Sequence, residues 1–93
     1  MKIFYGTENF SIDVTQMCLD KLNKNNIVTI PDGDDKRAFY FTDPLPGIHK
    51  KIFIDMDGAI HEYDEHNQIK INILDHTTTV INNNYITNKL SNM

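Results

Sequence analysis

The segment FTDPLPGIHKKIFI, from Phe41 to Ile54, ends one extended run and releases the chain into the next in a fixed direction. Pro44 and Pro46 lack backbone N–H groups, so neither can lie in the middle of a sheet. Pro46 and Gly47 suit the central pair of a type II turn, because proline presets φ and glycine accepts a positive φ. The segment therefore predicts a turn that is followed at once by a strand.

The strand after this turn alternates between apolar and polar residues, which predicts one buried and one exposed face. The first parity carries Ile48, Ile52, Ile54 and Met56, with Lys50 as its exception. The second parity carries His49, Lys51 and Asp55, with Phe53 as an apolar intruder. We expect the side of the strand that carries the isoleucines to face the core.

The clearest hairpin signal is the pair Asp57-Gly58, which lies between two extended runs. It predicts a two-residue type I′ turn with positive φ at both residues. Tight turns of this kind require antiparallel pairing of the strands that they join. The elements predicted after it are the strand Ala59–Tyr63, the turn Asp64–Asn67, and the strands Gln68–Leu74, Thr77–Ile81 and Tyr85–Thr87.

The first half of the chain contains the one predicted helix, Thr15–Leu22. Val14, Cys18 and Leu22 recur at the spacing of one helical face, and Asp13 precedes the helix as a capping residue. We interpret Cys18 as a buried apolar residue of that face. The other elements predicted here are the strands Lys2–Gly6, Ser11–Thr15, Asn26–Pro31 and Ala38–Thr42, with a polar turn at Asp32–Arg37.

These elements predict a mainly β protein, a compact antiparallel β-sandwich or jelly-roll-like fold with one short helix near residues 15–22. A more open α+β sheet with the helix on one face is the second interpretation. A length of 93 residues is enough for a single β-rich domain, residues 1–93, whose last residues, about 88–93, are expected to be frayed.

Charge and composition exclude several classes of function. The net charge is −4, so the chain is not drawn to nucleic acid by its overall charge. No apolar run approaches 18 residues, and the N-terminus lacks a secretory h-region, so we expect no membrane partner. A single cysteine fits a reducing compartment. We therefore expect an intracellular protein, or a fragment of a longer one.

Two polar segments resemble metal sites at first sight. HEYDEH (His61–His66) places its histidines five apart across a predicted turn, whereas the helical zinc motif needs them four apart. DGDD (Asp32–Asp35) lacks the ligand order of a calcium loop. We interpret both as turns and expect no metal, no cofactor and no catalytic residue. No nucleophile–base–orienter set can be assembled, so an enzyme is not expected.

A further pattern is the order of short signals along the first half of the chain, namely Tyr5-Gly6, Ile12–Thr15, Asp43-Pro44, Gly47, and Lys50 or Lys51. In this order the chain resembles a small β-rich module of amoebal giant viruses of the mimivirus type. It is more distantly similar to the C-terminal domain of mitochondrial DnaJ-like proteins. The chain has no HPD tripeptide, so the resemblance implies a β-rich accessory module without chaperone activity. For a viral protein, the location would be the host cytoplasm or the virion.

We therefore expect a non-enzymatic protein-interaction or structural module that acts through a sheet face or a strand edge. The alternative is a carbohydrate-binding accessory module that holds a glycan on exposed aromatic residues. The run Thr77–Thr87 carries no guarding charge, so it is the predicted edge for a protein partner or for a homo-oligomer. The candidate binding residues are Tyr5, Tyr40, Tyr63, Thr79 and Tyr85.

Overall fold

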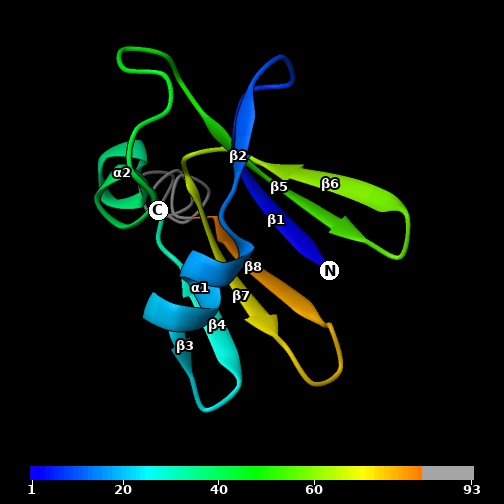
Figure 1. Ribbon diagram of the computed structural model, residues 1–93. Helices are drawn as coiled ribbons and strands as arrows, with labels where there is room; N and C mark the ends of the chain where they lie inside the picture. Colours follow the sequence, from blue (N-terminus) through cyan, green and yellow to red (C-terminus); the bar gives the residue numbers. More distant parts are fainter. Residues whose placement is uncertain (83–93) are drawn as a thin grey trace, which may run out of the picture.

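A computed structural model describes residues 1–82 and shows two four-stranded antiparallel sheets packed together (Figure 1). Sheet A has the order β2-β1-β5-β6 and is formed by β1 (Lys2–Gly6), β2 (Ser11–Asp13), β5 (Lys51–Met56) and β6 (Ala59–Tyr63). Sheet B has the order β3-β4-β7-β8 and is formed by β3 (Asn23–Lys24), β4 (Ile27–Ile30), β7 (Asn67–Asn72) and β8 (Thr78–Asn82). The helices are α1 (Thr15–Lys21) and α2 (Asp34–Phe41). The predicted mainly β, sandwich-like fold is confirmed.

The core lies where the inner faces of the two sheets meet the two helices. Because side chains alternate along a strand, every second residue of the central strands points into it. The residues that fill it are Ile3, Tyr5, Ile52 and Ile54 from sheet A, Val28, Ile30, Ile69 and Ile71 from sheet B, and Val14, Cys18 and Phe41 from the helical segments. The predicted inward face of β5 is thereby confirmed for Ile52 and Ile54, whereas Ile48, which precedes the strand, is 50% exposed.

The two turns predicted before and after β5 are present. Gly47 has φ of 80°, and the Ile48 N–H donates to the carbonyl of Leu45 at 3.1 Å, as a type II turn requires. Asp57 and Gly58 have φ of 53° and 84°, which is the left-handed pair of a type I′ hairpin between β5 and β6. The residues of these two turns therefore determine where the chain enters β5 and where it reverses direction after β5.

Replacing Gly58 by valine is expected to destabilise the fold by about 1–3 kcal/mol, because a β-branched residue is strained at positive φ. No atom of the described residues lies within 4 Å of a Cβ built on Gly58, so we expect the effect to come from backbone strain. Urea denaturation of the two proteins measures the difference. A midpoint equal to that of the wild type would contradict the turn assignment.

Helix α1 follows the prediction closely. The Asp13 carboxylate accepts hydrogen bonds from the Thr15 hydroxyl at 2.6 Å and from the Thr15 N–H at 2.9 Å, and these bonds lower the pKa of Asp13. Cys18 on the same helix is completely buried. Burial raises the pKa of the Cys18 thiol to about 12, so it is a core residue without nucleophilic reactivity at neutral pH.

The predicted aromatic strand Ala38–Thr42 is wrong, because this segment belongs to helix α2. Arg37 and Phe41 are four residues apart and form the buried face of that helix, whereas Phe39 is 81% exposed. The predicted polar turn before it contains the first helical turn, where the acidic residues Asp34 and Asp35 favourably face the helix dipole. The described part of the chain therefore has two short helices and not one.

A second difference is the short strand β3 after α1, which the sequence did not predict and which is followed by Asn25 and Asn26. They have φ of 53° and 65°, and they connect β3 to β4 as a tight hairpin. Asparagine adopts the left-handed conformation more readily than most residues, so the same property that ends a helix here also turns a hairpin. The extra strand β3 is the result.

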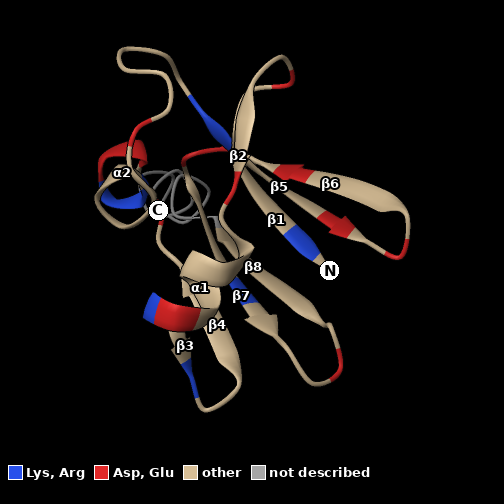
Figure 2. Ribbon diagram, viewed as in Figure 1, with Lys and Arg blue, Asp and Glu red and all other residues tan. Residues whose placement is uncertain are grey.

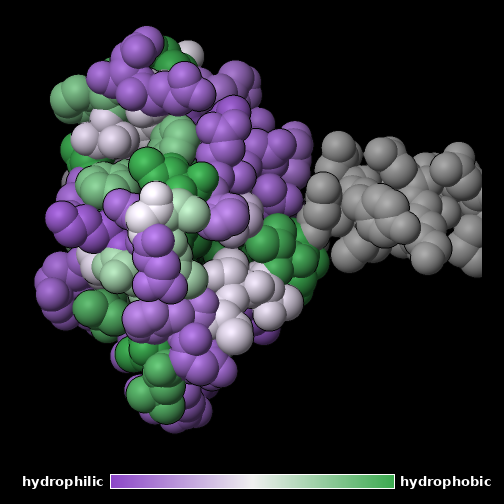
Figure 3. Space-filling view, turned by 90° about the vertical axis from the view of Figure 1, so that its right-hand side faces the viewer, coloured by the Kyte–Doolittle hydropathy of each residue, from purple (hydrophilic) through white to green (hydrophobic). Residues whose placement is uncertain are grey.

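The predicted strand Tyr85–Thr87 and the predicted frayed tail at 88–93 lie outside the described residues. Within residues 1–82, neither helix has the length and apolar character needed to cross a membrane. Figure 3 views the molecule from the side on which the β5–β6 hairpin protrudes, and it shows exposed hydrophobic residues in small groups between hydrophilic ones.

Candidate functional site

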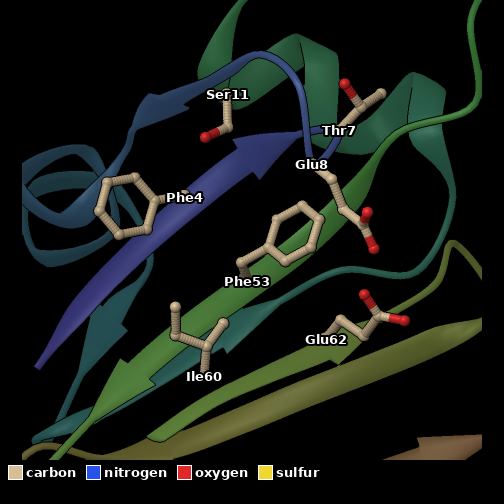
Figure 4. Close-up of a pocket in the computed structure, with 7 residues that line it drawn as sticks. All are labelled: Phe4, Thr7, Glu8, Ser11, Phe53, Ile60 and Glu62. Atoms are coloured by element: carbon tan, nitrogen blue, oxygen red, sulfur yellow. The ribbon is translucent and has the colours of Figure 1, made fainter. Parts of the chain in front are cut away.

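A groove of about 440 Å³ lies on the outer face of sheet A (Figure 4). Its apolar floor crosses three neighbouring strands, with Phe4 on β1, Phe53 on β5 and Ile60 on β6. Its polar rim consists of Thr7, Glu8, Ser11 and Glu62. A volume of this size can take one or two side chains of a ligand.

The groove arises from the residues that break the alternation of the strands. Phe4, Phe53 and Glu62 lie in one row across the sheet, because Phe53 pairs with Phe4 on one side and with Glu62 on the other. This row faces away from Ile52 and Ile54, which enter the core. Phe53 is 9% exposed, whereas Ile60 is 67% exposed, so the outermost strand offers most of the accessible apolar surface.

The rim of the groove is acidic at one end. Figure 4 shows Glu8 and Glu62 on the same side of the groove, beyond the ring of Phe53. Glu62 has a cationic neighbour, since its Oε1 lies 3.3 Å from the Nζ of Lys51. Glu8 takes part in none of the ion pairs found among residues 1–82. The groove therefore combines an apolar floor with an acidic end.

Strand β6 lies at the edge of sheet A and borders this groove. Met56 and Ala59 flank the two-residue turn, so they form a hydrogen-bonded pair of the antiparallel ladder. The next pairs alternate, and the backbone N–H and C=O groups of Ile60 and Glu62 consequently point away from β5. Among the described strands, β6 has no second neighbour that could pair with these groups.

A separate polar cluster joins α2 to the start of β5, where Figure 2 shows acidic residues close to basic ones. Lys50 is 4% exposed, and its Nζ lies 3.5 Å from Asp34 Oδ2 and 3.2 Å from Asp43 Oδ1. The Tyr5 hydroxyl donates to Asp34 Oδ1 at 2.8 Å, and burial together with this carboxylate raises the pKa of Tyr5 above its usual range. Lys50, which directly precedes β5, is therefore buried together with its carboxylate partners.

Arg37 on α2 is also completely buried. Its Nε donates to the carbonyl of Pro31 at 2.8 Å, and its Nη2 donates to the carbonyl of Asn67 at 2.6 Å. Its Nη1 has no hydrogen-bond partner within residues 1–82. Because burial disfavours the charged form, the pKa of Arg37 is lowered, although nearby Asp34 opposes the shift. Arg37 thus ties α2 to the end of β4 and to the start of β7.

The structure places the predicted binding residues apart from one another. Tyr5 is completely buried against Phe41, with ring centroids 5.6 Å apart. Tyr63 lies on the inner parity of β6 and Tyr40 on α2, and both are partly buried. Thr79 is exposed on β8, the edge strand of sheet B, and Tyr85 lies outside the described residues. The tyrosines therefore form no common exposed platform.

The residues of the groove were not predicted as a site, although the sequence holds a partial signal. Phe53 was recognised as an apolar residue on the polar parity of its strand, and Phe4 occupies the same outward parity of β1. A single apolar residue on the outward face of a strand indicates an apolar patch only when the neighbouring strand also has an outward-facing apolar residue beside it. The order of the strands in sheet A, with β1 beside β5, supplies that neighbour.

Comparisons with known proteins give no match to this chain, whether with family models, with curated proteins or with solved structures. The fold and the groove define a mainly β, two-sheet protein with an apolar and acidic surface site. The resemblance to giant-virus sequences and to DnaJ-like proteins stays an expectation from the sequence.

Proposed function

We propose that the protein is a non-enzymatic interaction module that binds an extended segment of a protein partner along the edge strand β6 and the groove beside it. The single observation that carries this proposal concerns Ile60 and Glu62. Both residues turn backbone groups that no described strand pairs with toward the edge of the sheet, and both line the groove with their side chains. Strand addition at a sheet edge uses both features, because the backbone supplies affinity and alternate side chains supply specificity.

The spacing of the two residues defines the partner. Ile60 and Glu62 are two positions apart on one face of the strand, so the bound strand also presents two residues at that spacing. The residue opposite Ile60 is apolar, and the residue opposite Glu62 is lysine or arginine, since Glu8 lies at the same end. The partner segment is therefore an extended run with an apolar and a basic residue separated by one position.

The proposal is tested with short synthetic peptides rather than with an unidentified partner. A threonine-rich octapeptide with the core Ile-Thr-Lys is titrated into the ¹⁵N-labelled protein, beside otherwise identical peptides with the cores Ile-Thr-Glu and Ser-Thr-Lys. We expect amide shifts for Ile60, Glu62 and Phe53 with the first peptide and weaker binding of the other two. An opposite-charge cross-strand pair contributes roughly 0.2–1 kcal/mol, so we expect the charge change to alter affinity about two- to fivefold.

Two variants make the test specific. Glu62→Lys is expected to reverse the preference, so that the Ile-Thr-Glu peptide binds more tightly than the Ile-Thr-Lys peptide. Ile60→Lys is expected to abolish binding, whereas Leu74→Lys, at a residue of similar exposure in sheet B's β7–β8 connection, leaves it unchanged. Equal binding of all three peptides, or amide shifts that map away from β6, would contradict the proposal.

The carbohydrate-binding alternative depended on Tyr5, Tyr40 and Tyr63 as an aromatic surface. With Tyr5 in the core, the exposed aromatic surface near these residues is that of Phe39, which packs edge-on against Tyr40 with centroids 5.2 Å apart. That pair lies on α2, away from the acidic groove, and a glycan there would leave the amides of β6 unperturbed. The peptide titration therefore separates the two hypotheses.

A further inference from the structure

Three polar side chains from distant parts of the sequence converge beside α2. Asp34 is the first residue of that helix, His49 precedes β5, and Glu65 lies in the connection between β6 and β7. One potential ligand atom from each lies within 4.8 Å of those from the other two. The set takes one residue from DGDD and one from HEYDEH, the two segments that we interpreted separately as turns.

The spacing is close to what a bound ion requires. Bonds from Zn²⁺ to nitrogen and oxygen of about 2.0–2.1 Å place neighbouring tetrahedral ligand atoms roughly 3.4 Å apart. His49 Nδ1 already lies 3.4 Å from Glu65 Oε1. The His49 side chain is 88% exposed, so its ring can rotate to bring the third ligand to the same spacing. A hollow of about 250 Å³ borders all three residues and leaves room for water as a further ligand.

The two carboxylate residues are held in place by groups outside the set. Asp34 Oδ1 accepts from the Tyr5 hydroxyl at 2.8 Å, and Asp34 Oδ2 accepts from the Lys50 N–H at 3.0 Å. The carbonyl of Glu65 accepts from the Gly33 N–H at 2.6 Å, which ties its loop to the start of α2. An ionised carboxylate has about four acceptor positions, so Asp34 keeps capacity for an ion. Such outer hydrogen bonds orient metal ligands in known sites.

The charge of the surroundings also suits a divalent cation. By formal charge, the residues that line the hollow sum to −3, from the four carboxylates of Asp34, Asp35, Asp43 and Glu65 and the ammonium of Lys50. Lys50 faces Asp34 and Asp43, and its Nζ also donates to the carbonyls of Leu45 and Ile48. The charge of Lys50 is therefore paired with Asp34, Asp43 and these two carbonyls rather than with His49 or Glu65.

We propose that Asp34, His49 and Glu65 form a binding site for Zn²⁺, with water completing the coordination. Imidazole with carboxylates selects zinc and similar first-row ions, whereas Mg²⁺ and Ca²⁺ prefer sites made of oxygen alone. This site revises the expectation from sequence that the protein binds no metal. It is separate from the groove on sheet A, so neither proposal depends on the other.

The test is a titration of the whole chain with ZnCl₂. Binding is monitored through the ring signals of the four histidines in ¹H–¹⁵N NMR spectra. We expect the His49 signals to shift and saturate at one equivalent, while those of His61 and His76 stay in place. Addition of MgCl₂ or CaCl₂ at the same concentration is expected to leave the His49 signals unchanged.

The variants His49→Ala and Glu65→Gln are expected to weaken zinc binding by more than about tenfold, as loss of a ligand exceeds the effect of losing an outer hydrogen bond. His61→Ala is the matched control, because it removes an exposed histidine outside the set. Circular dichroism of each variant verifies that it is folded. No saturation at about 100 µM zinc, or equal affinity of His49→Ala and His61→Ala, overturns the proposal.

Discussion

Replacing Lys50 by methionine is expected to lower the free energy of unfolding by about 3 kcal/mol or more. Methionine keeps the length of the apolar stem but removes the ammonium group, which leaves Asp34 and Asp43 facing each other without their cation. Removal of the cation is costly because the Asp34 side chain is only 19% exposed and its charge stays largely desolvated, whereas Asp43, at 36%, is partly hydrated. The carbonyls of Leu45 and Ile48 also lose their donor. Urea denaturation at neutral pH measures the change.

The neighbouring lysine provides the control for this experiment. Lys51 is also paired, with Glu62 at 3.3 Å, but both side chains of that pair are nearly half exposed. Exposed pairs contribute about 0–1 kcal/mol, so Lys51→Met is expected to change stability by no more than that. If the two variants lose the same amount, the burial of Lys50 has no energetic consequence, and our account of the Asp34 cluster is wrong.

Replacing Gly6 by alanine is expected to lower the free energy of unfolding by about 2–5 kcal/mol. A Cβ on Gly6 would lie 2.3 Å from the carbonyl oxygen of Phe10 and 2.6 Å from Ser11 Cα. These are backbone atoms, so the clash cannot be relieved by rotation of a side chain. The φ of Gly6 is +153°, which adds strain for any residue with a Cβ. The expected structural result is separation of β2 from β1, where Gly6 pairs with Ser11.

Gly47→Ala is the matched control for Gly6→Ala. Gly47 also has positive φ, but nothing lies within 4 Å of a Cβ built there, so only backbone strain of about 1 kcal/mol or more applies. Hydrogen exchange adds a local measurement, since the amides of β2 should exchange faster in Gly6→Ala and not in Gly47→Ala. Equal stability of the two variants would show that β2 can move away from β1 without cost.

Much of the fold could be predicted from residues that are close in sequence. The alternation of β5 and β7, the type II turn at Pro46-Gly47 and the type I′ turn at Asp57-Gly58 depend on steric limits and periodicity over a few residues. The segment 34–41 was predicted incorrectly for a physical reason. Its consecutive apolar residues fit either period, and only the packing of Arg37 and Phe41 under α2 selects the helix.

The candidate sites could be predicted only in fragments. The sequence showed Phe53 as an apolar residue on the polar face of its strand and Lys50 as a charged residue on the apolar face. Neither observation predicted which residues would lie beside them in the fold. The groove needs Phe4 beside Phe53, which are 49 positions apart in the chain, and this pairing follows from the position of β1 between β2 and β5. The order of the strands is set by the shared core and not by any local pattern.

Local sequence was enough to predict the strands on both sides of the Asp57-Gly58 hairpin, the turns before and after β5, and the buried face of β5, because these properties arise from short-range sterics and from the separation of apolar and polar side chains. The tertiary structure alone decided that Lys50 is buried beside Asp34 and that Asp34, His49 and Glu65 converge. It also decided that α2 is a helix. Those outcomes depend on desolvation and on contacts between segments that meet only when both sheets close on one core.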